Sequence, residues 1–248
     1  MTDHAGTAGS LHEPGLAFHP RAALLCLLGG TFVVTLDFFI VAVALPSIQA
    51  DLAASQAQLQ WVVAAYGLVF ASALVACGRI GDQLGRRRLF GAGVAVFTAA
   101  SAGCGLAPDA GTLIAARALQ GLGAAAITPQ VLAMLGTLYA GRRRAWAFSW
   151  YGLALGGAAT SGQLVGGLLI EADPGGLGWR ACFLVNLPVG LALLAMLRAA
   201  VPRIAPQAGS RPDLAGAALL AAALAGLLWP VIEGRQAGWP AWSAAVIA

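Results

Sequence analysis

The chain has 248 residues, of which 59% are hydrophobic and only 10% are charged. Because a soluble globular protein carries about 25% charged residues, this composition excludes an ordinary water-soluble domain. The formal net charge of +4 does not indicate a nucleic-acid partner, because the arginines are spread over short connections between apolar segments. The cysteines stand singly, without the C-x-x-C spacing of a metal site, so we expect neither a metal ion nor another cofactor.

The apolar residues are gathered into long runs, and a membrane-spanning helix needs about 20 such residues. The runs indicate an all-helical integral membrane protein, because only helices and closed barrels satisfy their backbone groups inside a bilayer. They cover residues 22–45, 59–77, 89–107, 112–139, 146–170, 181–201 and 214–232.

These runs divide the chain into three parts. Residues 1–20 are polar and are expected to form a flexible cytoplasmic tail, and residues 21–201 a unit of six helices. Residues 202–248 hold a linker, a seventh span and the start of an eighth near Trp239, which stops after too few residues to cross a bilayer. Because half a helix leaves backbone groups without partners in lipid, we expect the chain to be the N-terminal part of a longer protein.

The arginines predict the orientation of the helices. Most of them lie in alternate connections, and connections rich in Arg face the cytoplasm. We therefore expect a multi-pass protein of the cell (inner) membrane with its N-terminus in the cytoplasm. The residues on the expected cytoplasmic side are Arg21, Arg79, Arg86, Arg87, Arg88, Arg142, Arg143, Arg144, Arg198, Arg203 and Arg211.

The connection between the second and third runs is a cluster of charges and glycines. It resembles the signature loop of the major facilitator superfamily, G-x-x-x-D-x-x-G-R-R. The resemblance implies a gating loop on the cytoplasmic side, in the N-terminal six-helix unit of a transporter that pairs two such units. Within the connection, which covers residues 78–88, the matching residues are Gly78, Asp82, Gly85, Arg86 and Arg87.

Asp37 lies inside the first run, where an ionisable residue is by default a candidate for function. A carboxyl group that gains and loses a proton there is a candidate proton carrier. Its segment, from Leu36 to Pro46, resembles the L-D-x-T-x-V-N-V-A-L-P motif of the fourteen-span drug:proton antiporters. Phe39 and Ala42 replace the Thr and Asn of that motif. The alternative is a polar residue near the outer interface that has no role.

Arg117 lies near the start of the fourth run and keeps its charge even when it is buried. It therefore needs a carboxylate partner or a water-filled cavity, unless its side chain reaches the outer surface. The segment that begins at Arg117 resembles the family motif R-x-x-Q-G-x-G-A-A, which implies a part in proton coupling. Gln120 follows at i+3 and so shares the face of Arg117.

Further residues resemble cavity positions of the same antiporter group. Trp61 and Tyr66 match the Q-W-x-x-x-x-Y stretch of the second helix. Trp61 is explained equally well as a residue of the aromatic belt at the membrane surface. We expect Trp61, Tyr66, Gln120 and Gln163 to line the substrate cavity.

The fifth run carries Gly162, Gly166 and Gly167 in a segment similar to the antiporter motif G-P-x-x-G-G, with Gln163 in place of Pro. Small residues four positions apart let another helix approach closely, so we expect these glycines to pack against a neighbouring helix. The sixth run begins with residues 179–190, which resemble the W-R-x-x-F-x-x-N-L-P-x-G stretch of the same group.

The resemblance implies a proton-driven exporter of small apolar or cationic compounds, such as drugs or antibiotics. Its partners would be the small-molecule substrate, protons, the lipid bilayer and the missing C-terminal half. An importer or facilitator on the same fold, suggested by Gln163, and a non-transporting membrane sensor are the alternatives. An enzyme is not expected, because H-E-x-x-H and G-x-S-x-G motifs are absent and Asp37 is the only acid well inside a span.

Overall fold

The computed structural model describes residues 19–202 and 214–234, and every regular element in these ranges is a helix. Six segments are long and apolar enough to cross a membrane, which confirms the expected all-helical membrane fold. The helices are α1 (Pro20–Leu52), α2 (Gln56–Leu84), α3 (Arg86–Gly105), α4 (Ala110–Leu138), α5 (Gly141–Ala172), α6 (Ala181–Leu184), α7 (Asn186–Ala200) and α8 (Leu214–Gly234), with 3-10 turns at Pro174–Gly176 and Gly178–Arg180.

The helices are longer than the apolar runs that predict them. At about 1.5 Å per residue, the 33 residues of α1 cover roughly 50 Å, whereas the hydrocarbon core of a bilayer is about 30 Å thick. Polar and charged residues at the membrane surface continue the helix, because their backbone groups still gain from helical hydrogen bonds. The ends of the apolar runs therefore underestimate the ends of the helices.

The expected connection at residues 78–88 shows this most clearly, and its predicted length is wrong. Helix α2 continues through this sequence to Leu84, and α3 begins at Arg86. Gly85 alone makes the turn, at φ 95° and ψ 123°, a conformation that glycine adopts at little cost. Most of the residues assigned to a loop therefore stand on helices.

The helices that follow two short connections, α2 and α4, are capped by side chains. Ser55 and Gln58 form a capping box, in which Gln58 N donates to Ser55 Oγ (3.2 Å) and Ser55 N donates to Gln58 Oε1 (2.9 Å). Asp109 accepts a bond of 2.9 Å from the backbone N–H of Thr112 at the start of α4. This hydrogen bond holds the pKa of Asp109 below its ordinary value.

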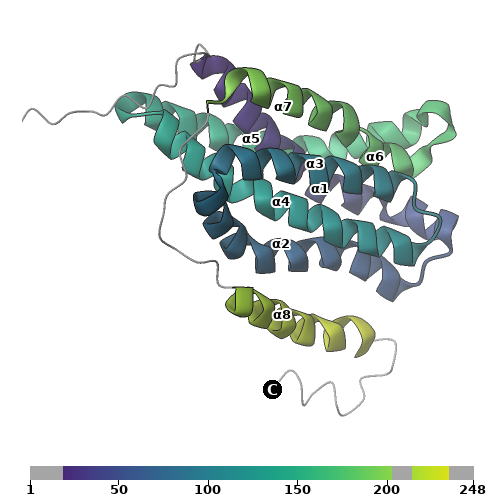
Figure 1. Ribbon diagram of the computed structural model, residues 1–248. Helices are drawn as coiled ribbons and strands as arrows, with labels where there is room; N and C mark the ends of the chain where they lie inside the picture. The colour runs from purple at the N-terminus through teal and green to yellow at the C-terminus, as the bar shows by residue number, and fades with distance from the viewer. Residues whose placement is uncertain (1–18, 203–213, 235–248) are drawn as a thin grey trace, which may run out of the picture.

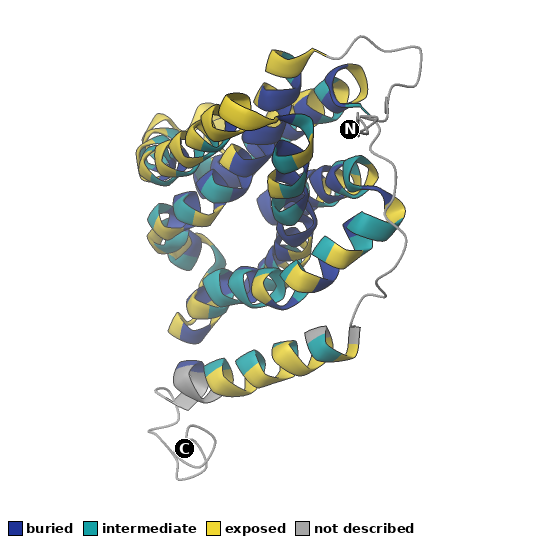
Figure 2. Ribbon diagram, turned by 90° about the vertical axis from the view of Figure 1, so that its left-hand side faces the viewer, coloured by how far each residue is buried: buried dark blue, intermediate teal, exposed yellow. Residues whose placement is uncertain are grey.

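The first seven helices form one bundle, and α8 packs on the outside of it along one side of α2 (Figure 1). Within the bundle α4 packs on α2 and α3, α1 packs on α5, and α7 covers α1 and α3. Exposed residues follow most of α8 and the outer face of α5, as Figure 2 shows in yellow. In a membrane protein, such apolar faces meet lipid or another helix.

The core has two hydrophobic clusters that meet along α1. Phe90 and Phe97 belong to one, and Leu113 and Phe183 to the other. Helices α3 and α4 approach very closely between them, since a Cβ added to Gly123 would lie 2.7 Å from the backbone N of Phe97. This close approach brings the polar side chains of α3 within reach of those on α4.

The outermost sequence predictions fall outside the described residues. They are the tail up to residue 18, the linker at residues 203–213 and the eighth run near Trp239. The seventh run corresponds to α8, whose apolar part, Ala218–Trp229, is shorter than the six membrane-crossing segments.

Candidate functional site

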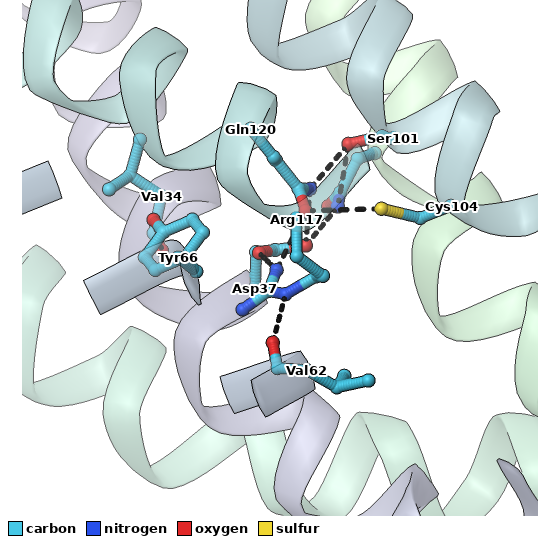
Figure 3. A network of polar contacts seen from close by, with 9 residues as sticks. Val34, Asp37, Val62, Tyr66, Ser101, Cys104, Arg117 and Gln120 are labelled. Carbon is cyan, nitrogen blue, oxygen red and sulfur yellow. Dashed lines mark hydrogen bonds and ion pairs between the residues drawn. The ribbon is translucent and has the colours of Figure 1, made fainter. Parts of the chain in front are cut away.

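Asp37 on α1 and Arg117 on α4 form a buried ion pair inside the bundle (Figure 3). Arg117 Nη1 lies 2.5 Å from Asp37 Oδ2, and neither side chain has any exposed surface. The alternatives of a snorkelling Arg117 and of an interfacial Asp37 are therefore wrong. Each side chain instead has the opposite charge that burial in a low-dielectric interior requires.

Two amide side chains complete the hydrogen bonding of the carboxylate, and Ser101 bonds to both amides. Gln120 Nε2 donates to Asp37 Oδ1 (2.8 Å), and Asn186 Nδ2 donates to the same oxygen (2.7 Å). Ser101 Oγ accepts from both amides, at 2.7 Å from Gln120 and 3.3 Å from Asn186. We call Asp37, Arg117, Gln120, Ser101 and Asn186 the polar network; its members come from α1, α3, α4 and α7.

Arg117 is held by further contacts on its other sides. Its Nη1 also donates to Gln120 Oε1 (2.7 Å), and its Nε donates to the carbonyl of Val62 on α2 (3.2 Å). The guanidinium carbon lies 4.3 Å from the ring centroid of Tyr66, a cation–π geometry. Tyr66 is fixed in turn by a hydrogen bond of 3.3 Å from its hydroxyl to the carbonyl of Val34.

This arrangement places two opposite charges side by side in the bundle interior. With Asp37 ionised, the network carries one negative and one positive charge that compensate each other. A proton on Asp37 would leave Arg117 with an uncompensated charge in the bundle interior, which is energetically costly. The charge of Asp37 is therefore compensated within a network whose side chains come from α1, α3, α4 and α7.

Asn186, Ser101 and Cys104 were not expected at the site from the sequence. Cys104 Sγ lies 3.6 Å from Gln120 Oε1. Asn186 carried a signal, because it is the only asparagine in the chain and follows an apolar segment. The replacements at Phe39 and Ala42 do not leave Asp37 without partners, since α4 and α7 supply its contacts.

The residues of the expected gating loop form a second cluster, where α2, α3 and α4 meet. Arg86 Nη2 lies 3.0 Å from Asp82 Oδ1, and Arg86 Nη1 donates to the carbonyl of Ala133 (3.2 Å) and to Thr137 Oγ1 (3.0 Å). Arg87 points elsewhere, donating to the carbonyl of Arg198 at the end of α7 (3.2 Å).

The remaining loop residue, Gly78, lies on α2 where this helix faces α4, but the approach of the two helices does not require a glycine. A Cβ added there would lie 3.8 Å from the Cβ of Pro129, an ordinary van der Waals contact. Asp82, Arg86 and Arg87 thus tie together the ends of α2, α3, α4 and α7.

The structure does not bring the four expected cavity residues together. Tyr66 and Gln120 are buried at the polar network, whereas Gln163 lies on the exposed face of α5. The Trp61 ring lies 6.2 Å from the ring of Trp229, where α2 meets α8. These four residues therefore do not form one cluster among the described residues.

Two of the three expected packing glycines of α5 contact a neighbouring helix, and the third does not. Gly162 and Gly166 lie against α1, where an added Cβ would come within 3.0 Å of Phe39 Cβ and 2.9 Å of Ile40 Cγ1, respectively. The expectation that Gly167 packs likewise is not met, because no described atom lies within 4 Å of a Cβ built there. Within the described ranges, no three His, Cys, Asp or Glu side chains are grouped so that they could hold a metal ion.

Six apolar membrane-crossing segments thus surround a buried, hydrogen-bonded ion pair. The chain belongs to the Major Facilitator Superfamily, whose sequence profile matches residues 27–248. The resemblance seen in the sequence motifs is thereby confirmed.

Two relatives indicate which members of the superfamily are similar. The chain is 38% identical over 241 residues to a probable actinorhodin transporter of Streptomyces coelicolor, covering 97% of this chain and 42% of the relative. It is 42% identical over 222 residues to a puromycin resistance protein of Streptomyces alboniger, covering 87% and 42%. The chain thus spans less than half the length of these relatives.

A solved structure supports the fold. A bacterial homologue of the human lysosomal transporter Spinster, in an inward-facing and unoccupied conformation, has a TM-score of 0.64 at 21% sequence identity. The match covers 93% of this chain and 59% of that chain. At this identity, the comparison shows a shared fold and nothing about the substrate.

Proposed function

We propose that this chain forms one helical unit of a proton-coupled exporter, with Asp37 as the proton carrier and Arg117 as its permanent counter-charge. The observation that carries the proposal is the ion pair of 2.5 Å, which has no exposed surface and lies inside membrane-crossing helices. Ionisable residues inside spans are costly, and they mark ion and proton pathways.

The coupling follows from the charge balance of the pair. Protonation of Asp37 removes the negative charge, and the guanidinium of Arg117 then favours a conformation in which it meets water or another partner. Deprotonation restores the ion pair. A proton that enters the cell supplies ~2.3 kcal/mol per 100 mV of membrane potential and ~1.4 kcal/mol per pH unit.

The direction and the substrate class rest on the relatives. The actinorhodin transporter and the puromycin resistance protein are named for antibiotics, and another relative, from Streptomyces glaucescens, is a tetracenomycin C resistance and export protein with 36% identity over 239 residues. From these relatives we infer export of drug-like compounds, which we expect to be small and either apolar or cationic.

We further propose that transport needs a second helical unit. Residues 21–201 make up the first unit, and this chain spans 42% of the length of its actinorhodin relative. Alternating access requires two units that rock about a site between them. Exposed apolar side chains along α5, such as Trp150, Leu153 and Leu164, are suited to cover by such a unit.

The orientation is also proposed, with the N-terminus in the cytoplasm of the cell. Tyr139 at the end of α4 bonds to the carbonyl of Pro20, and Arg87 bonds to the carbonyl of Arg198. These contacts gather the arginine-rich helix ends at the end of the bundle where α1 begins. The positive-inside rule assigns such an end to the cytoplasm.

The proposal can be tested with the two-unit protein in liposomes that carry an imposed pH gradient, with ethidium as the transported cation. Asp37→Asn should abolish gradient-driven movement of the dye. Asp51→Asn is the matched control, because Asp51 also stands on α1 and pairs with an arginine, Arg180, but is 46% exposed. Gradient-driven movement that survives in Asp37→Asn would assign proton coupling to another residue.

A further inference from the structure

Two polar atoms in the polar network are buried without any hydrogen-bond partner among the described residues. They are Arg117 Nη2 and Asn186 Oδ1. Buried polar groups are nearly always paired, so each such atom calls for an explanation. Asn186 is 1% exposed. Its amide nitrogen donates two hydrogen bonds, whereas its amide oxygen accepts none from the described residues.

The amide of Asn186 stands directly on the carboxylate that we propose to carry the proton. Its Nδ2 atom donates to Asp37 Oδ1 (2.7 Å) and to Ser101 Oγ (3.3 Å). A half-turn about the terminal torsion exchanges the positions of Nδ2 and Oδ1 with little change of shape. Asn186 can therefore present either two donors or one acceptor to the same place.

Protonation reverses what Asp37 needs from its neighbours. An ionised carboxylate only accepts hydrogen bonds, whereas a carboxylic acid also has one O–H to donate. When a proton from water forms an O–H bond at Oδ1, the two amide N–H groups that now point at this oxygen no longer suit it. Oδ2 remains an acceptor for Arg117.

Of the two amides, only Asn186 is free to turn. The Oε1 atom of Gln120 already accepts from Arg117 Nη1 (2.7 Å) and lies 3.6 Å from Cys104 Sγ, so rotating Gln120 would break contacts. Rotating Asn186 leaves one atom of the amide unpaired before and after the turn. The hydroxyl of Ser101 can follow, because it donates as readily as it accepts.

We propose that Asn186 is a positioning residue that switches its amide with the protonation state of Asp37. It donates an N–H to the carboxylate, and it turns to accept the O–H of the carboxylic acid. The inference rests on the proton-carrier role of Asp37 given above. Asn186 is the first residue of α7, so the switch acts where the sixth span changes from α6 to α7.

The other titratable or charged groups near Asp37 do not provide this acceptor. Arg117 on α4 only donates hydrogen bonds. Tyr66 on α2 gives its hydroxyl to the carbonyl of Val34, and Cys104 on α3 faces Gln120. Cys182 on α6 faces the carbonyl of Gly166 at 3.9 Å.

The sequence offers a direct probe of this switch, because Asn186 is the only asparagine among the 248 residues. Asparagine labelled with ¹³C at its side-chain carbonyl therefore places one labelled group in the whole chain. Infrared spectra of the 248-residue chain in lipid nanodiscs, recorded while the pH is lowered, would follow this carbonyl and the carboxylic-acid band of Asp37 together. The Asp37 band is assigned by its absence in Asp37→Leu, or in Asp37→Ser if the leucine variant does not fold.

The proposal expects the labelled carbonyl band to shift to lower wavenumber at the same pH at which the Asp37 acid band appears, and to be independent of pH in the Asp37 variants. Gln130→Leu removes another buried amide, bonded to the carbonyl of Cys77 at 2.9 Å, and should leave both changes intact. An Asp37 band that appears without any change in the labelled carbonyl would overturn the switch alone. The lack of any Asp37 acid band at all pH values would overturn the proton-carrier role with it.

Discussion

Asp37→Asn should strongly destabilise the helix unit, because it removes one charge of a buried pair and leaves the other. The guanidinium of Arg117 stays protonated even when buried. In the variant it would face a neutral amide where the carboxylate oxygen now lies at 2.5 Å. Gln120 and Asn186 would also lose a charged acceptor, so their hydrogen bonds of 2.8 and 2.7 Å would weaken.

The magnitude follows from the burial of both partners. Removing one partner of a buried ion pair costs about 3–5 kcal/mol in the free energy of unfolding. We expect Asp37→Asn to fall in this range, because neither side chain is exposed. The double variant Asp37→Asn/Arg117→Gln has no unpaired charge, so it should be more stable than Asp37→Asn alone.

The two single variants should differ in their dependence on pH. In Arg117→Gln the carboxyl group of Asp37 can neutralise itself by taking up a proton. The folded variant then binds more protons than the unfolded chain, so its stability should increase as the pH is lowered. The loss of unfolding free energy in Asp37→Asn should change little over the same pH range, because the guanidinium of Arg117 cannot lose its charge.

The chain provides its own reporter of unfolding. Cys26, Cys77, Cys104 and Cys182 are all buried, so a thiol-reactive fluorescent dye becomes bright only when the helices separate. Asp51→Asn is the control, because its pair with Arg180 is partly exposed and such pairs contribute about 0–1 kcal/mol. A melting temperature of Asp37→Asn equal to that of Asp51→Asn would refute the claim that the buried pair holds the bundle together.

Three further predictions concern other parts of the molecule. Asp82→Asn should reduce transport by the two-unit protein. It should lower the free energy of unfolding by less than about 1 kcal/mol, because Arg86 keeps its hydrogen bonds to Ala133 and Thr137. Unchanged transport rates would exclude a gating role for this cluster. Gly123→Val should lower the free energy of unfolding by about 1–3 kcal/mol, because the added side chain overpacks against Phe97. Gly152→Ala has no described atom within 4 Å of the added Cβ, so it should melt at or above the wild-type temperature. Equal melting temperatures of the two variants would contradict the close approach of α3 and α4. The 248-residue chain reconstituted alone should insert into vesicles without moving cationic dyes along a pH gradient, and robust dye movement would indicate instead a working pair of identical units.

Hydropathy predicted the order of the first six membrane-crossing segments, because a span needs about 20 apolar residues to cross the lipid. The expected seventh span is a shorter apolar helix, Ala218–Trp229. Hydropathy did not predict where the helices end, as the turn at Gly85 shows. There the helices continue beyond the apolar runs, and the turn needs only one residue with positive φ. Charge and glycine content marked the position of this turn but not its length.

The sequence identified Asp37 and Arg117 as candidates but did not show that their side chains meet. Asp37 and Arg117 are 80 positions apart, and the rotation of each helix about its axis decides whether their side chains meet. That rotation is set by close contacts such as Gly123 against Phe97, which depend on the packing of whole helices. Ser101 resembles an ordinary small residue of a helix interface, and nothing in its neighbourhood in the sequence distinguishes it.

The most direct test of the account is whether substrate binding expels the proton from Asp37. Binding of ethidium to the purified two-unit protein in a weakly buffered solution should release protons, because substrate and proton favour opposite states of the ion pair. The release should disappear in Asp37→Asn and persist in Asp51→Asn. Equal proton release from Asp37→Asn and the wild-type protein would contradict the assignment of the buried pair as the coupling site.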